Sequence, residues 1–136
     1  MTRLVLDTNV WVSGLLFRGQ VSQIVQRAFD RDFVSLMSRA MRKELRSVLS
    51  RKRFALGRAV VGNHMRHIGK FTEIVKTTRK ITVISADPSD NMFLECAASG
   101  HADAIISGDR HLLDLKRMEE IEILSPAEWL RRHPKL

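Results

Sequence analysis

The stretch RLVLDTNVWV, residues 3–12, determines how the rest of the chain is interpreted. Its apolar run at 4–6 is typical of a short buried strand, and Asp7 stands where that run ends. Thr8 and Asn9 follow before apolar residues resume. Ligands bind open α/β sheets at the carboxyl ends of the strands, so Asp7 is a candidate site residue. It could equally form an Asx turn with its own backbone.

Apolar runs alternate with amphipathic segments along the chain. We predict strands at 3–6, 33–38, 80–85, 104–107 and 121–124, and helices at about 20–30, 39–50, 63–77 and 110–116. A further helix starts in ADPSDN, residues 86–91, and ends at Gly100; residues 10–16 have a mixed pattern. Ser125, Pro126 and Glu128 fit a capping box that opens a last helix. Strands that are apolar throughout favour a mostly parallel sheet covered on both faces, in one α/β domain spanning 1–136.

Three acids come just after predicted strands: Asp7, Asp90 and Asp109. Each could instead be a turn or helix cap. Glu44, on the 39–50 helix, has no Lys or Arg three or four residues away, which suggests that it faces inward. Clustered carboxylates repel one another without a cation. The histidines, His111 among them, look isolated, so the expected ligands are oxygens and the expected ion is Mg²⁺ or Mn²⁺.

Positive charge gathers in the middle of the chain. The net charge is +8, and residues 39–80 hold thirteen Lys or Arg against two acids. Such a segment suggests a polyanionic partner, although a solvated helical surface would also explain it. No RNA-binding aromatic signature accompanies the cluster, so contacts to phosphates are expected. The candidate nucleic-acid-binding residues are Arg46, Arg51, Lys52 and Arg53.

Four pieces of the sequence together resemble the PIN-domain family. They are LVLDTNVWVSGL near the start, Glu44 on its helix, DPSDNMFLECAASGHADAIISGD, and RHLLDL after it. The branch most similar is the VapC-like ribonuclease toxins of toxin–antitoxin pairs, and the resemblance runs from residue 4 to about 128. It implies a three-layer α/β/α sandwich with a central, mostly parallel sheet.

The resemblance also implies a function and its residues. These are Mg²⁺- or Mn²⁺-dependent cleavage of RNA, single-stranded or in loops, a cognate antitoxin and a homodimer. The implied catalytic and metal-binding acids are Asp7, Glu44, Asp90 and Asp109, with Asp87 competing for the third place. The implied supporting residues are Thr8, Asn9, Asn91 and Ser107.

Two other functions compete with this interpretation. A haloacid-dehalogenase-type phosphatase would share the VLDTN strand, but it needs an aspartate two residues after the nucleophile, where Asn9 stands. A non-catalytic, RNA-binding PIN scaffold is the other. No apolar run is long enough to span a membrane, no signal-peptide pattern opens the chain, and the one cysteine, Cys96, reads as a small core residue. We therefore expect a cytoplasmic protein.

Overall fold

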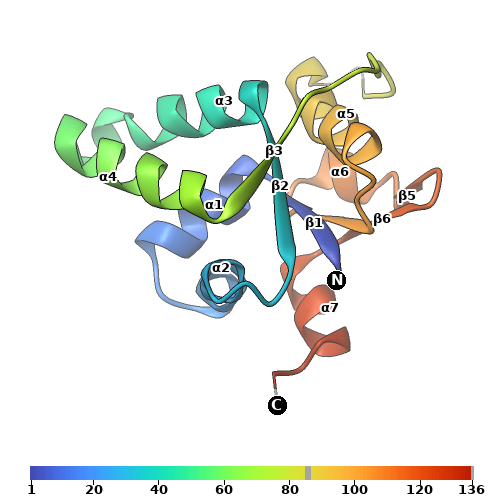
Figure 1. The fold of residues 1–136 in the computed structure, drawn as a ribbon, viewed down its shortest axis with the longest axis horizontal. Coiled ribbons are helices and arrows are strands. Elements are labelled where there is room, and N and C mark those ends of the chain that lie inside the picture. The colour runs from blue at the N-terminus through green and yellow to red at the C-terminus, as the bar shows by residue number, and fades with distance from the viewer. Residues whose placement is uncertain (85–86, 136) are drawn as a thin grey trace.

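A six-stranded sheet forms the centre of the structure, a computed structural model that describes residues 1–84 and 87–135 (Figure 1). The strands lie in the order β3-β2-β1-β4-β6-β5, and all neighbours are parallel except β5 and β6. The predicted α/β class with a mostly parallel sheet is therefore confirmed. The strands are β1 (Arg3–Leu6), β2 (Val34–Ser38), β3 (Thr72–Val75), β4 (Ala104–Ile106), β5 (Arg117–Met118) and β6 (Ile121–Leu124).

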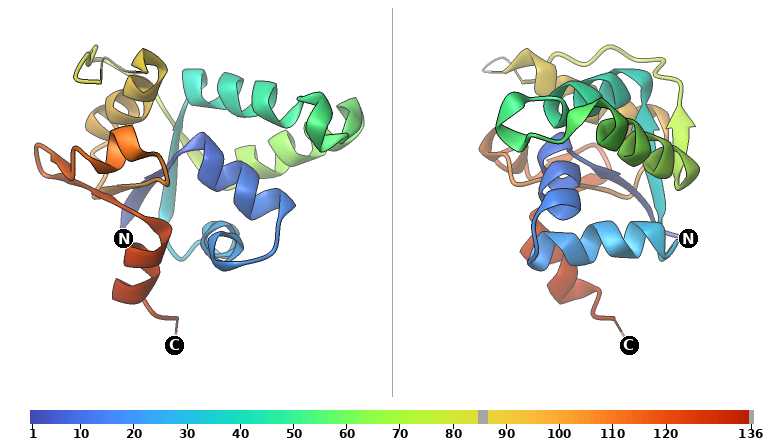
Figure 2. Two further views of the ribbon diagram at one scale, coloured as in Figure 1. Left: turned by 180° about the vertical axis from the view of Figure 1, so that it is seen from behind. Right: turned by 90° about the vertical axis from the view of Figure 1, so that its left-hand side faces the viewer.

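Helices cover both faces of this sheet and make three layers. Helices α1 to α4 lie on one side and α5 and α6 on the other, while α7 packs against α2 (Figure 2). Short 3-10 turns, η1 and η2, precede α4 and α5. The bounds are α1 (Thr8–Leu16), α2 (Gln20–Phe29), α3 (Arg39–Leu49), η1 (Lys52–Phe54), α4 (Gly57–Lys70), η2 (Pro88–Asp90), α5 (Asn91–Ser99), α6 (Arg110–Leu113) and α7 (Pro126–Arg132).

The core lies between the sheet and its helices, as the apolar runs predicted. All three apolar residues of β1 are at most 1% exposed, because helices cover both of its faces. Helix α3 buries the expected stripe of Met41, Leu45 and Val48. Cys96 is fully buried, and burial raises the pKa of its thiol to about 12, so it is the core residue the sequence predicted.

Helix ends follow the predicted capping chemistry. The Ser125 hydroxyl accepts a hydrogen bond from the Glu128 amide at 3.1 Å, and the Glu128 carboxylate accepts one from the Ser125 amide at 3.3 Å. Pro126 occupies the first turn of α7, and α5 ends immediately before Gly100. None of the helices in the two described ranges has the length and apolar character needed to cross a membrane.

Two predicted elements were wrong. The helix expected at 63–77 is α4, which ends at Lys70, and the chain then enters β3. Residues 80–84 of the strand expected at 80–85 form no strand, and residue 85 lies outside the described residues. Ile81 and Ile84 are nevertheless buried, so the apolar pattern reflected packing without strand pairing. The mixed pattern at 10–16 belongs to α1, which buries four of its first five residues rather than one narrow stripe.

Candidate metal and active site

The point where the sheet reverses its strand order brings distant residues together. From β1 the chain builds outward through β2 and β3, and it then returns to β4 on the other side of β1. Leu6 pairs with Ile106, and the Asp7 amide donates to the Ile106 carbonyl at 3.1 Å. Asp7 and Ser107 are therefore the first residues beyond two adjacent strand ends, which is where open α/β sheets bind ligands.

A pocket of about 200 Å³ at these strand ends is lined by all four predicted acids, and we call it the acidic pocket. A larger cavity of about 620 Å³, between α1, α2 and the residues after α7, has no acid in its lining. The acidic pocket is lined by Asp7, Thr8, Asn9, Glu44, Val48, Arg51, Asp87, Ser89, Asp90, Phe93 and Asp109.

Asp7 is held by hydrogen bonds to both carboxylate oxygens. Its Oδ1 accepts from the Val10 amide at 2.8 Å and so caps α1, and its Oδ2 accepts from the Ser107 hydroxyl. The Ser107 hydroxyl in turn accepts from the Asp109 amide at 2.9 Å. Burial raises the pKa of Asp7 to about 6, with smaller contributions from the charges of Asp109 and Glu44, while the Ser107 and Val10 hydrogen bonds oppose the rise. Asp7 therefore caps α1 and lines the acidic pocket at the same time.

Glu44 enters the same pocket from α3. It is half-buried, and its Oε2 accepts a hydrogen bond from the Thr8 hydroxyl at 3.1 Å. The contact ties α3 to the start of α1, and it explains why Glu44 has no basic partner on its own helix. Thr8 is buried, whereas Asn9 is exposed at the rim.

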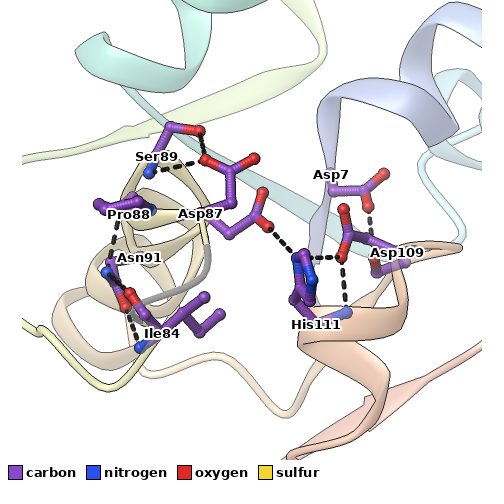
Figure 3. A network of polar contacts seen from close by, with 10 residues as sticks. Asp7, Ile84, Asp87, Pro88, Ser89, Asn91, Asp109 and His111 are labelled. Atoms are coloured by element: carbon purple, nitrogen blue, oxygen red, sulfur yellow. Dashed lines mark hydrogen bonds and ion pairs between the residues drawn. The ribbon is translucent and has the colours of Figure 1, made fainter.

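Asp90, Asp109 and His111 form a compact group (Figure 3). The His111 Nδ1 lies 3.8 Å from Asp90 Oδ2 and 3.7 Å from Asp109 Oδ1, and the His111 amide donates to Asp109 Oδ1 at 2.7 Å. Asp109 thereby caps α6. The interpretation of His111 as isolated is wrong. His111 comes two residues after Asp109, in the first turn of α6, and therefore lies at the same end of the strands as the acids.

Asp90 has a buried oxygen without a hydrogen bond among the described residues, whereas its competitor Asp87 is hydrogen-bonded to Ser89. Within the described parts of the chain, Asp90 Oδ2 is buried and forms no hydrogen bond. Burial raises the pKa of Asp90 to about 6; the charges of Asp109 and Asp87 add to this, and His111 opposes it. Asp87 is exposed, and its Oδ1 accepts from the Ser89 hydroxyl at 2.6 Å.

Asn91 does not face the acids. Its side-chain nitrogen donates to the Ile84 carbonyl at 2.8 Å, and its Oδ1 accepts from the Ile84 amide at 2.9 Å (Figure 3). A second bond, at 3.1 Å, reaches the Pro88 carbonyl. Asn91 therefore joins Ile84 to Pro88 at the start of η2, and so supports the position of Asp90 indirectly.

The donor set fits a divalent cation. One ligand atom each from Asp90, Asp109 and His111 lies within 4.8 Å of the other two. A cation there would interact with Asp90 Oδ2, which accepts no hydrogen bond among the described residues, and it would offset the repulsion between the carboxylates. Carboxylate oxygens suit Mg²⁺ and Mn²⁺, and imidazole nitrogen is a ligand of transition metals.

The four predicted nucleic-acid-binding residues are not equally placed. Arg51 lines the acidic pocket, whereas Arg46 and Lys52 are exposed and do not. Arg53 is also exposed, and its guanidinium lies 4.8 Å from the centre of the Phe54 ring. One arginine is therefore positioned at the acids, and the others lie on the surrounding surface.

Comparison with known proteins agrees with this architecture. Residues 3–111 match the PIN domain family. The structure of VapBC2 from Rickettsia felis bound to a DNA fragment from their promoter is similar, with a TM-score of 0.63 and 13% identity, covering 91% of this chain and 98% of that chain.

PAE2754 from Pyrobaculum aerophilum is similar with a TM-score of 0.67 and 14% identity, covering 96% of this chain and 94% of that chain. No curated protein matches the sequence. At such low identity the two structures show a shared fold, while the family match covers most of the chain. This chain belongs to the PIN-domain family.

Proposed function

We propose that this protein is a Mg²⁺- or Mn²⁺-dependent ribonuclease that hydrolyses RNA phosphodiester bonds. The observation that carries the proposal is the acidic pocket, where the buried Asp90 Oδ2 accepts no hydrogen bond from the described residues and lies among further carboxylates, with Arg51 at the same pocket. A guanidinium beside a cation-binding acid cluster suits a phosphodiester, because the arginine and the cation both complement the phosphate charge.

In this proposal the acids hold the cation and their neighbours hold the acids. Asp7, Glu44, Asp90 and Asp109 bind the metal, with His111 as an additional donor; when bound, the ion activates water and stabilises charge developing at phosphorus. Ser107 orients the Asp7 carboxylate and Thr8 orients that of Glu44. Asn91 positions the turn that carries Asp90, and Asn9 faces the substrate at the rim.

We further propose that residues 1–136 are one nuclease domain acting in the cytoplasm as the toxin of a toxin–antitoxin pair. The likeness to the VapBC2 structure supports an antitoxin partner, and the family resemblance supports a homodimer. The phosphatase alternative is not retained, because the chain belongs to the PIN-domain family. A non-catalytic RNA-binding role is separated from the proposal by experiment.

The test is cleavage of single-stranded RNA, structured RNA and DNA with Mn²⁺, with Mg²⁺ and with EDTA. We expect metal-dependent RNA cleavage that Asp7→Asn reduces by about 100-fold or more. Asp103→Asn is the matched control, because Asp103 lies just before β4, at the opposite end of the strands. Its carboxylate accepts a hydrogen bond from the Arg3 amide there at 2.8 Å. Equal cleavage by Asp7→Asn would reject the site, and RNA binding without cleavage by the native protein would favour the non-catalytic scaffold.

A further inference from the structure

An aromatic hollow lies next to the acidic pocket, on the surface of α1. It has a volume of about 500 Å³ and is lined by Asn9, Val12, Ser13, Phe17, Arg53 and Phe54. We call it the Phe17 hollow. Asn9 lines both the hollow and the acidic pocket, so the two are neighbours. Neither capping nor the proposed metal site accounts for it.

Phe17 is exposed to an extent that folding does not explain. Its side chain follows the last turn of α1 and is 58% exposed. Among the large apolar side chains exposed in the described part of the chain, it is the one aromatic ring. A single exposed ring is ordinary on a folded protein, but Phe17 shares a hollow with a second ring and an arginine, and such a joined surface is what marks a binding site.

The hollow combines flat apolar surface with positive charge. The rings of Phe17 and Phe54 lie 6.5 Å apart at an angle of 59°, and the Arg53 guanidinium covers Phe54. Aromatic rings and arginine planes are the surfaces on which unpaired bases stack. The sequence predicted only phosphate contacts for this cluster, since residue 17 lies far from residues 53 and 54 along the chain.

Helix α1 sets the direction from the acids to the hollow. Asn9, Ser13 and Phe17 are spaced by four residues and so share one face of the helix. This face begins at the acidic pocket and extends for about 12 Å. An RNA strand that has one phosphate at the acids and runs along this face of α1 would bring a base to Phe17. This base lies near the cleaved bond but not directly at it.

We propose that the Phe17 hollow binds an unpaired nucleobase of single-stranded RNA by stacking on Phe17 beside the Arg53–Phe54 pair. The inference rests on the proposed nuclease function and adds to it a base-binding subsite, which bases stacked within a duplex cannot enter. The neighbouring acidic pocket and the positive charge of Arg53 and Arg51 favour this occupant over a protein segment.

The test measures binding of labelled oligonucleotides to protein carrying Asp7→Asn, so that cleavage does not interfere. The probes are single-stranded RNA, a strand of equal length and charge without bases, and duplex RNA. Phe17→Ala should weaken binding of single-stranded RNA by about 5- to 150-fold and leave the other two probes unchanged. Phe17→Trp should restore binding, because its ring also stacks. Val60→Ala, which changes an exposed apolar residue of α4, should have no effect.

Several outcomes would overturn the inference. Unchanged binding by Phe17→Ala, or an equal loss with the strand that lacks bases, would show that no base is stacked there. If Phe17→Ala changed the molar mass of the protein measured by light scattering, the hollow would be assigned to a contact between copies of the chain. In each of these cases metal-dependent cleavage by the native protein would still stand. Failure of the proposed function is distinct, because the native protein would then not cleave RNA, whether or not it binds it.

Discussion

The buried carboxyl of Asp7 makes stability depend on pH. Its pKa rises from an ordinary value of 3.8 to about 6 in the fold. Between these values the native state binds more protons than the unfolded state, so the free energy of unfolding falls as pH rises through this window. The loss is complete above pH 6 and amounts to about 3 kcal/mol at most.

Asp7→Asn removes this charge and should therefore stabilise the metal-free protein at pH 7. Chemical unfolding in EDTA at several pH values measures the effect. We expect the difference between Asp7→Asn and the native protein to widen from pH 4 to pH 7. Parallel pH profiles would mean that the Asp7 carboxyl is not destabilised by burial.

Ser107 offers a second prediction, because its hydroxyl joins two parts of the pocket. Ser107→Ala leaves the buried Asp7 Oδ2 and the Asp109 amide without this partner, and should cost about 1–3 kcal/mol of unfolding free energy. Ser35→Ala is the matched control: Ser35 is 1% exposed, and its hydroxyl has no hydrogen-bond partner among the described residues. Equal losses in the two variants would contradict a bridging role for Ser107.

The sequence predicted single residues well where chain position alone decides the location. Asp7 follows β1 directly and Asp109 comes shortly after β4, so their positions just past two strands were enough to bring them to the same end of the sheet. By the same logic Asp103, which comes directly before β4, belongs at the other end of the strands, and its contact with the Arg3 amide agrees. His111 and Phe17 escaped prediction, because what matters for each is a neighbour from another element: Asp90 for His111 and Phe54 for Phe17.

At the scale of elements, the packing of α1 on α2 depends on a small residue. A Cβ at Gly14 would lie 2.2 Å from Val25 Cγ2, so the helices could not keep their separation. Gly14→Ala should destabilise the protein by about 1–3 kcal/mol. Gly62→Ala in α4 is the control, since its Cβ would meet nothing closer than 3.5 Å, and it should stabilise by about 0.5–1 kcal/mol. Thermal unfolding compares the two, and a stabilised Gly14→Ala would contradict this packing.

The position of β3 shows why the strand predicted at 80–85 was wrong. Residues 80–84 have the stronger β-branched pattern, yet the strand is Thr72–Val75. Those four residues pair with β2 from Ser35 to Ser38, and this pairing is a property of the assembled sheet. β-propensity mainly describes fit to a half-buried surface, so Ile81 and Ile84 satisfy it by packing alone. Local pattern predicted the number of parallel strands but not the position of this one.

At the scale of the whole molecule, the uneven charge predicts salt-dependent RNA binding. The affinity for single-stranded RNA should fall with salt, and each phosphate contact adds about 0.7 to the slope of log K against log salt. Arg51→Gln should lower that slope by about this amount, because Arg51 lines the acidic pocket. Arg131→Gln is the matched control, on α7 and outside the pocket lining. Titrations at several salt concentrations compare them; equal slopes for the two variants would remove Arg51 from the RNA path.

The pairing of β1 with β4 has a consequence for biosynthesis. The first acid of the pocket, Asp7, is translated a hundred residues before its neighbour Ser107, and Asp109 follows Ser107. A partly translated chain therefore carries Asp7 with no pocket around it. For the proposed ribonuclease, the messenger has to be read past the codon for Asp109 before the emerging protein is able to cut any RNA.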